Sequence, residues 1–272
     1  MEDREQITTI AARDVRSLAV SKDGRWVAAG TAWGDVGVWN AKTYQNVFSH
    51  RGDNRNNNGV DFSPDSTRLV AASNYTATIW DIGTRKKVLT LGHENFVEAA
   101  TYSPYGDRIA TATGYSVRLW NSNDGRLLAD IPVTVTPAYN TGLLWLNDHL
   151  FAVSKSAIRE IEASTGSTVS EMPVPYSSIF SCIALPKHGE FIAYSTQDIV
   201  TFWDTATHTQ LGLFQRTQDI RSIAVSPDDR FLAIGGYDGN ITINSLSHII
   251  VSILSRWILR HMNNFVASVV FP

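Results

Sequence analysis

Short apolar runs, separated by polar turns, recur along the whole chain. Runs such as Trp26–Gly30, Leu69–Ser73 and Phe231–Gly236 are rich in Val, Ile, Ala and Thr, and polar turn residues bound each of them. Apolar runs of this length between turns favour β-strands over helices. The pattern therefore predicts an all-β chain.

The runs belong to a repeating unit of nearly constant length. Each unit ends on a β-friendly segment, and the anchor positions are 41, 40, 41, 42 and 41 residues apart: Trp39, Trp80, Trp120, Ile161, Trp203 and Asn244. A turn signal precedes each anchor: Ser21–Gly24, Ser63–Ser66, Ser103–Gly106, Leu146–Asp148, Pro186–Gly189 and Ser226–Asp229. Such turns have a physical basis, because Pro presets φ, Asp hydrogen-bonds the local backbone and Gly accepts positive φ.

Each unit contains three strands and a more variable fourth one, such as Val88–Leu91 or Leu211–Phe214. Four short strands in about 41 residues is the size of one propeller blade. The dipeptides Trp80-Asp81, Trp203-Asp204 and Gly92-His93 resemble the signatures of the WD40 family. The resemblance covers roughly residues 6–246. It implies a closed β-propeller of four-stranded antiparallel blades.

The six units predict six blades over residues 1–246, and a seventh blade built from the tail is the alternative. Residues 7–11 read as a strand with no blade before it, so we expect them to pair with the strand around 241–244 and close the ring. Residues 247–272 form a hydrophobic tail that does not continue the repeat. This tail suits a membrane-surface or partner-docking helix, a segment packed on the ring, or the atypical end of an incomplete chain.

The resemblance also implies a buried hydrogen-bonded set in each blade, made of a His, a Ser or Thr, an Asp and the Trp. His93 has Trp120 in its blade, but the turn before Trp120 reads Gly114-Tyr115 and supplies no Asp. Trp39 has Asp35 but no equivalent His, and Ile161 and Asn244 replace the Trp. We therefore expect the fourth and sixth blades to be packed less tightly than the others.

Composition changes this picture little. The chain is 43% hydrophobic and 18% charged, with a net charge of −3, which argues against a dominant electrostatic grip on nucleic acid or membrane. Cys182 is the only cysteine and sits in an apolar run, so a core position is predicted. The acidic, polar start favours an intracellular protein, cytoplasmic or nuclear, and the charged residues of the tail argue against a transmembrane segment.

The residues that usually carry chemistry do not form a recognisable pattern. The sequence holds no GxxxxGK[ST], GxSxG, HExxH or CxxC motif, and its seven histidines are scattered without ligand spacing. No enzyme activity, metal or cofactor is therefore expected. A propeller enzyme would need acids converging on the channel, whereas the innermost runs Leu18–Val20 and Ile223–Val225 are apolar. A chromatin- or RNA-associated WD40 subunit is a further alternative.

The candidate site is a rim of aromatic residues in the turns between second and third strands. Trp33, Tyr75, Tyr115 and Tyr237 lie 6, 5, 5 and 7 residues before their anchors, which places them at one end of the blades. The loops before the blades add His93, Tyr139 and Tyr176 at the same end. Tyr and Trp are favoured where proteins recognise one another. The sequence thus predicts a non-catalytic scaffold that binds other proteins on this face, although single exposed aromatics also occur without function.

Overall fold

The computed structural model describes residues 14–51, 57–133, 142–153, 157–174, 180–186, 189–226 and 228–247. The chain divides into two compact units, residues 1–137 with 141–171 and residues 138–140 with 172–272. The boundary between them falls inside one strand, β16 (Ser167–Pro173).

The first unit consists of four antiparallel sheets, each built from four strands that follow one another in sequence. The first comprises β1 (Val15–Val20), β2 (Trp26–Thr31), β3 (Val36–Asn40) and β4 (Asn46–His50). The second comprises β5 (Asn57–Phe62), β6 (Arg68–Ser73), β7 (Thr76–Asp81) and β8 (Lys86–Gly92). The third comprises β9 (Val97–Tyr102), β10 (Arg108–Thr113), β11 (Ser116–Asn121) and β12 (Leu127–Pro132). The fourth comprises β13 (Leu143–Leu146), β14 (His149–Val153), β15 (Ala157–Glu162) and β16.

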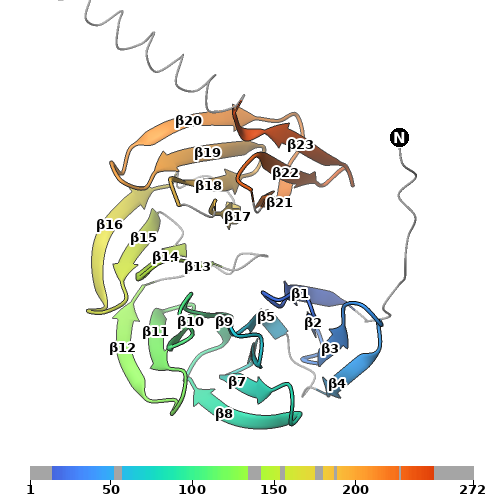
Figure 1. The fold of residues 1–272 in the computed structure, drawn as a ribbon. Helices are drawn as coiled ribbons and strands as arrows, with labels where there is room; N and C mark the ends of the chain where they lie inside the picture. Colours follow the sequence, from blue (N-terminus) through green and yellow to red (C-terminus); the bar gives the residue numbers. More distant parts are fainter. Residues whose placement is uncertain are drawn as a thin grey trace, which may run out of the picture. The chain divides into compact units, whose positions relative to one another are not determined.

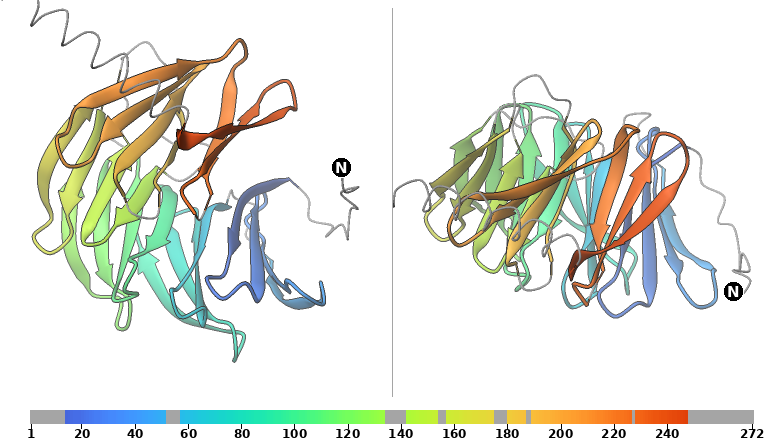
Figure 2. Two further views of the ribbon diagram at one scale, coloured as in Figure 1. Left: turned by 45° about the horizontal axis from the view of Figure 1, so that its top comes forward. Right: turned by 90° about the horizontal axis from the view of Figure 1, so that it is seen from above.

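Within this unit, neighbouring sheets pack face to face as propeller blades do. The innermost strands lie side by side, β1 against β5, β5 against β9 and β9 against β13, while β4, β8, β12 and β16 lie on the outside (Figure 1). Figure 2 shows these sheets from two further directions, with tight turns at both ends of the strands. The core fills the space between blades: Phe48 of the first packs with Leu69 and Trp80 of the second.

The second unit contains two further antiparallel sheets. One comprises β17 (Phe180–Ala184), β18 (Phe191–Thr196), β19 (Ile199–Asp204) and β20 (Gln210–Gln215), and the other comprises β21 (Ile220–Val225), β22 (Phe231–Gly236) and β23 (Ile241–Ser245). Strand β17 lies beside β21, and Phe202, Leu232 and Leu246 are buried between the sheets. The described residues therefore form six antiparallel blades, five of four strands and one of three, which confirms the predicted fold class.

The predicted ring closure lies outside the described residues, because it depends on residues 7–11. The same holds for nearly all of the tail, residues 248–272, and for the seventh blade that it was expected to supply as the alternative. The pairing of residues 7–11 with the strand around 241–244 thus stays a prediction.

The predicted turns form as their chemistry requires. At the first turn, the Ser21 hydroxyl accepts a hydrogen bond from the backbone N–H of Trp26 at 2.9 Å and donates one to Asp23. The fourth residue has positive φ in five of the six turns: 71° at Gly24, 60° at Ser66, 76° at Gly106, 68° at Gly189 and 55° at Asp229. Glycine adopts this conformation without strain, whereas Ser66 and Asp229 adopt it at a cost in conformational energy.

The Asp that follows the anchor Trp also has a structural role. The Asp81 carboxylate accepts hydrogen bonds from the backbone N–H and the hydroxyl of Thr84, both at 2.7 Å. Asp204 accepts from the backbone N–H of Thr207 in the same way, also at 2.7 Å. These carboxylates stabilise the turn into the fourth strand, which explains why they repeat from blade to blade.

Bulges recur at equivalent places in the blades. The fourth strand carries one beside each anchor Trp of the described blades: Trp39, Trp80, Trp120 and Trp203. A bulge adds one residue, bends the strand and increases its twist. The bend of the outer strand thus recurs at the level of the indole in these four blades.

Four of the six anchor positions are buried, whereas Trp39 and Asn244 are partly buried. Trp80, Trp120 and Trp203 are buried, and Ile161 of the fourth blade is fully enclosed. Cys182 is buried as predicted, and its Sγ lies 2.9 Å from the Ser195 hydroxyl oxygen. Burial raises the pKa of this thiol to about 11, so it stays protonated at neutral pH.

Candidate partner-binding face

Three of the predicted rim residues occupy equivalent turns of the first unit. Trp33 follows β2, Tyr75 follows β6 and Tyr115 follows β10. Their exposed fractions are 49%, 40% and 69%. Because the three blades pack side by side through β1, β5 and β9, these turns lie at the same end of the unit. The unit therefore presents three large rings to solvent in a row.

Two of the three rings are held in place by neighbours. The indole N–H of Trp33 donates to the Asp14 carboxylate at 3.0 Å. Tyr75 stacks on Phe96, with ring centroids 4.8 Å apart, and Phe96 is itself exposed. Rings that are already ordered lose little conformational entropy when they bind. Phe96 extends the aromatic surface, but the repeat does not predict it, because it lies in the loop between β8 and β9 rather than in a turn between second and third strands.

The other predicted residues are placed differently. Tyr237 lies in the second unit, in the turn after β22; it is 66% exposed, with the Arg221 guanidinium 3.9 Å from the centre of its ring. Tyr139 and Tyr176 lie outside the described residues.

His93 belongs to the core of the third blade. Trp120 Nε1 donates to the Thr111 hydroxyl at 2.8 Å, and His93 Nε2 is hydrogen-bonded to the same hydroxyl, also at 2.8 Å. The other ring nitrogen, Nδ1, lies 3.2 Å from the Leu91 carbonyl oxygen. Burial, together with the charge of Arg118, lowers the pKa of His93 to about 4. Both nitrogens are used inside the protein, so we leave His93 out of the proposed contact surface.

Thr111→Val tests this assignment. The substitution keeps the shape but removes the shared hydroxyl, which leaves Trp120 Nε1 and His93 Nε2 buried without partners. We expect the free energy of unfolding to fall by about 1–3 kcal/mol. Urea denaturation measures it, with Thr90→Val on the exposed side of β8 as the matched control. Equal losses in the two variants would contradict a structural role for the hydroxyl.

An acidic residue on an innermost strand was also missed by the sequence. Asp61 on β5 is only partly exposed and accepts hydrogen bonds from the Thr101 hydroxyl and the backbone N–H of Tyr102, both at 2.8 Å. Burial raises the pKa of Asp61 to about 6. The carboxyl group joins the second blade to the third, and its hydrogen bonds to neighbouring strands suit a structural group.

Within the described ranges, no group of three or more His, Cys, Asp or Glu side chains is placed to hold a metal ion. Over the same residues, no helix is long and apolar enough to cross a bilayer.

The comparison with protein families agrees with this architecture. A profile described as "WD domain, G-beta repeat" matches residues 4–40, 47–81, 85–121 and 209–243, more than half of the chain. The chain belongs to the WD40 family. Each of the second and third WD40 matches begins near the outermost strand of one blade and ends with the third strand of the next. The matches leave out residues 122–208, which include the fourth blade with its Ile161 anchor.

Curated relatives match at low identity. Autophagy-related protein 16 of Arabidopsis thaliana is 27% identical over 69% of this chain and 39% of its own length. Serine-threonine kinase receptor-associated protein of Gallus gallus is 22% identical over 81% of this chain and 61% of its own length. Small ribosomal subunit protein RACK1 of Drosophila melanogaster is 28% identical over 38% of this chain and 33% of its own length. The chain thus spans less than two thirds of these relatives.

Solved structures share the fold. The Cps50 (Swd1) β-propeller domain of Myceliophteria thermophila superposes with a TM-score of 0.76 at 19% identity, covering 89% of this chain and 85% of its own. Kuenenia stuttgartiensis hydrazine synthase gives the same TM-score at 15% identity, covering 92% of this chain and 82% of its own. At such identities the likeness shows the fold alone, so the second match says nothing about catalysis here.

Proposed function

We propose that this WD40 chain is a non-catalytic scaffold that binds partner proteins through Trp33, Tyr75 and Tyr115, with Tyr237 in the equivalent turn of the second unit. The observation that carries the proposal is the exposure of large rings in turns that need only small or polar residues. Exposed Trp and Tyr offer contact area together with a polar group, which is why they dominate many binding interfaces.

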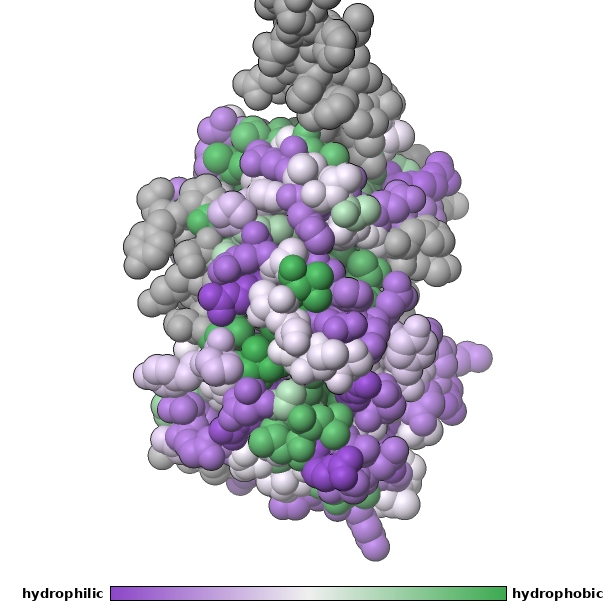
Figure 3. All heavy atoms as spheres, turned by 90° about the vertical axis from the view of Figure 1, so that its left-hand side faces the viewer, coloured by the Kyte–Doolittle hydropathy of each residue, from purple (hydrophilic) through white to green (hydrophobic). Residues whose placement is uncertain are grey.

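Two further observations support a scaffold. WD40 relatives are typically protein-interaction scaffolds, and the chain shares their repeats. On the face shown in Figure 3, apolar groups form small separate patches among polar ones. This face therefore presents no broad apolar patch that would serve as an alternative partner-binding surface. An intracellular location, cytoplasmic or nuclear, stays a prediction.

The double variant Trp33→Ala/Tyr115→Ala tests the proposal. A partner captured with the intact chain is identified and purified, and its Kd is then measured by calorimetry. We expect each substitution to cost more than about 1 kcal/mol of binding free energy, roughly a fivefold rise in Kd. The unfolding midpoint should change little, because both side chains are exposed.

Tyr105→Ala is the matched control. Tyr105 is 72% exposed and lies in the turn between β9 and β10, at the opposite end of the blade that carries Tyr115. It should leave the Kd unchanged. If Tyr105→Ala weakens the partner as much as Tyr115→Ala does, or if the rim variant loses stability rather than affinity, the aromatic rim is not the binding surface.

No observation favours the two alternatives over the scaffold. A propeller enzyme would need free acids on the innermost strands, whereas the Asp61 carboxyl accepts two hydrogen bonds from the neighbouring blade. A chromatin- or RNA-associated role would need a concentrated basic surface, and the net charge of −3 gives no support to one.

A further inference from the structure

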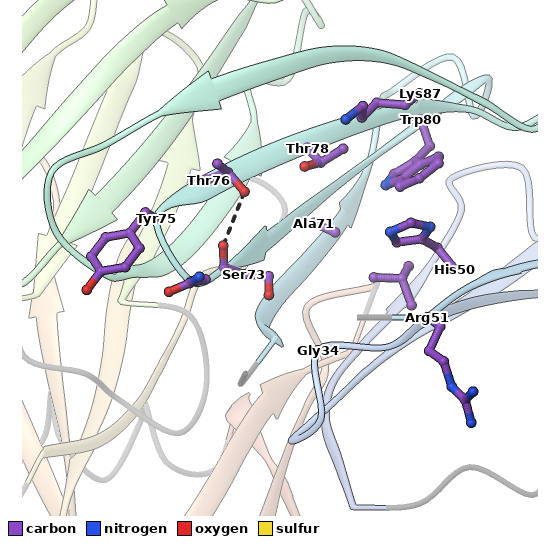
Figure 4. Close-up of a pocket in the computed structure, with 12 residues that line it drawn as sticks. Gly34, His50, Arg51, Ala71, Ser73, Tyr75, Thr76, Thr78, Trp80 and Lys87 are labelled. Atoms are coloured by element: carbon purple, nitrogen blue, oxygen red, sulfur yellow. Dashed lines mark hydrogen bonds between the residues drawn. The ribbon is translucent and has the colours of Figure 1, made fainter. Parts of the chain in front are cut away.

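A cavity of about 330 Å³ lies between the first and second blades of the first unit. It is bordered by the turn residues Gly34 and Tyr75 and by the end of β4 at His50 (Figure 4). Its volume lies in the range of sites that hold small ligands, about 300–1,000 Å³. All the residues around it belong to the first unit.

One residue difference between two blades leaves the Trp80 indole beside the cavity without the partner that Trp120 has. In the third blade, Trp120 pairs with Ile109 and the hydroxyl that binds the indole comes from Thr111, two residues further along the strand. In the second blade, Trp80 pairs with Leu69, and the residue two positions further along is Ala71. Ala71 therefore stands where the third blade has its threonine.

Both indoles have a histidine ring beside them, although from different positions: His50 is the last residue of β4, whereas His93 follows β8. Only Trp120 has the bridging hydroxyl. The His50 ring lies 4.5 Å from the Trp80 ring, much as His93 lies 5.2 Å from Trp120. Within the described part of the chain, neither His50 nor Trp80 Nε1 makes a hydrogen bond. Figure 4 shows the two rings facing one another, with Ala71 and Thr78 beside the indole. The missing hydroxyl leaves both space and an unused indole donor.

The lining is rich in hydrogen-bond donors and in positive charge. Lys87 and Arg51 border the cavity together with the Thr78 hydroxyl, and among the described residues that line it none is Asp or Glu. Neither Lys87 nor Arg51 forms an ion pair with another described residue. Ammonium, guanidinium and indole N–H groups offer protons and no acceptor. An anion is the ligand that satisfies this set, because hydrogen bonds to charged acceptors are the stronger ones.

We propose that this cavity binds an anionic side chain of a peptide, a carboxylate or a phosphate, between Trp80 Nε1, Lys87 and Arg51. The volume exceeds that of a bare ion and accommodates the side chain with part of its backbone. The cavity adjoins the aromatic rim at Tyr75, so its test uses Ala71, Lys87 and Arg51 rather than the exposed rings. A failure of one proposal leaves the other standing.

The test follows the indole N–H signal of Trp80 in the full ¹⁵N-labelled chain, with the signal assigned by Trp80→Phe. Three probes are titrated: acetyl-Gly-phosphoserine-Gly-amide, acetyl-Gly-Glu-Gly-amide and the uncharged acetyl-Gly-Ser-Gly-amide. We expect a saturable shift with at least one of the two anionic peptides and not with the uncharged one. The tighter of the two anionic probes identifies phosphate or carboxylate as the group that the site prefers.

Two kinds of variant separate this site from unspecific attraction. Lys87→Gln and Arg51→Gln should each raise the Kd of the preferred probe about two- to fivefold, as expected for partly exposed ion pairs. Lys42→Gln, an exposed cation of the turn between β3 and β4, should not change it. Ala71→Thr should fill the space, occupy the indole N–H and abolish binding, while the urea midpoint stays the same or rises.

Several outcomes would overturn the proposal. One is the absence of a saturable Trp80 shift with both anionic peptides; another is an equal shift with the uncharged peptide. Binding that Lys42→Gln weakens as much as Lys87→Gln does would show general charge attraction. Full binding by Ala71→Thr in a folded chain would place the ligand elsewhere.

Discussion

Trp203→Ala is expected to lower the free energy of unfolding by about 3–5 kcal/mol, and Trp80→Ala by a similar amount. Both side chains are buried beside a bulged outer strand, so truncation removes apolar contact and leaves a void that the bent strand cannot fill. Asn244→Ala in the sixth blade is expected to cost less than about 1 kcal/mol. The Asn244 amide nitrogen is buried and has no hydrogen-bond partner among the described residues, so Asn244→Ala breaks no hydrogen bond of that nitrogen.

Urea denaturation followed by circular dichroism and by fluorescence measures these differences, provided that the two transitions coincide. Trp33→Ala serves as the matched control, since it removes the same ring from an exposed turn. It should cost far less than either buried Trp. Equal losses at Trp203 and Asn244 would show that the sixth repeat is misaligned and that Asn244 is not its anchor.

The second large effect is the pH dependence of the free energy of unfolding over the range in which Asp61 titrates. Burial raises the pKa of this carboxyl from 3.8 to about 6 in the folded chain. The folded state therefore keeps the proton while the unfolded chain ionises, so the contribution of Asp61 to stability is highest below about pH 4 and falls as the pH rises towards 6. The loss amounts to at most about 3 kcal/mol, and above pH 6 it is constant.

Asp61→Asn should remove this dependence. The amide oxygen still accepts from the Thr101 hydroxyl and the Tyr102 N–H, so the variant should equal or exceed the wild type at pH 7. Unfolding free energies of both proteins are compared from pH 4 to pH 7. Parallel curves would show that Asp61 does not titrate in this range.

Asp23→Asn provides a control of opposite sign. Hydrogen bonds from the Arg25 backbone N–H and the Ser21 hydroxyl lower the pKa of Asp23 to about 2. Its contribution to stability is present above about pH 4 and is lost as the pH falls through 2. In a titration extended to pH 2, the wild type should lose stability relative to Asp23→Asn only below about pH 4.

The strands, the turns and the repeat length follow from local features of the chain. The anchor spacing and the Ser-Pro-Asp-Gly type of turn predict blades because each turn is built from hydrogen bonds between residues at most five positions apart. The exposure of Trp33, Tyr75, Tyr115 and Tyr237 could be anticipated for the same reason, because a hairpin turn at a blade end faces solvent. Their role in binding stays a prediction.

The environment of individual side chains between blades required the tertiary structure. The family resemblance implied a buried set for His93 and Trp120, and the loop position of His93 suggested the binding face; the structure buries His93 against Thr111. Asp61 on an innermost strand bonds to the next blade. The sequence does not distinguish Ala71 from other small strand residues. Only the structure shows that it lines a cavity together with Trp80 and His50. In a strand, a shift of one residue moves a side chain to the opposite face, and the recurrent bulges make such shifts. The sequence alone thus determined the repeating blade, whereas packing between blades decided which side chains are buried, bonded or open to a ligand.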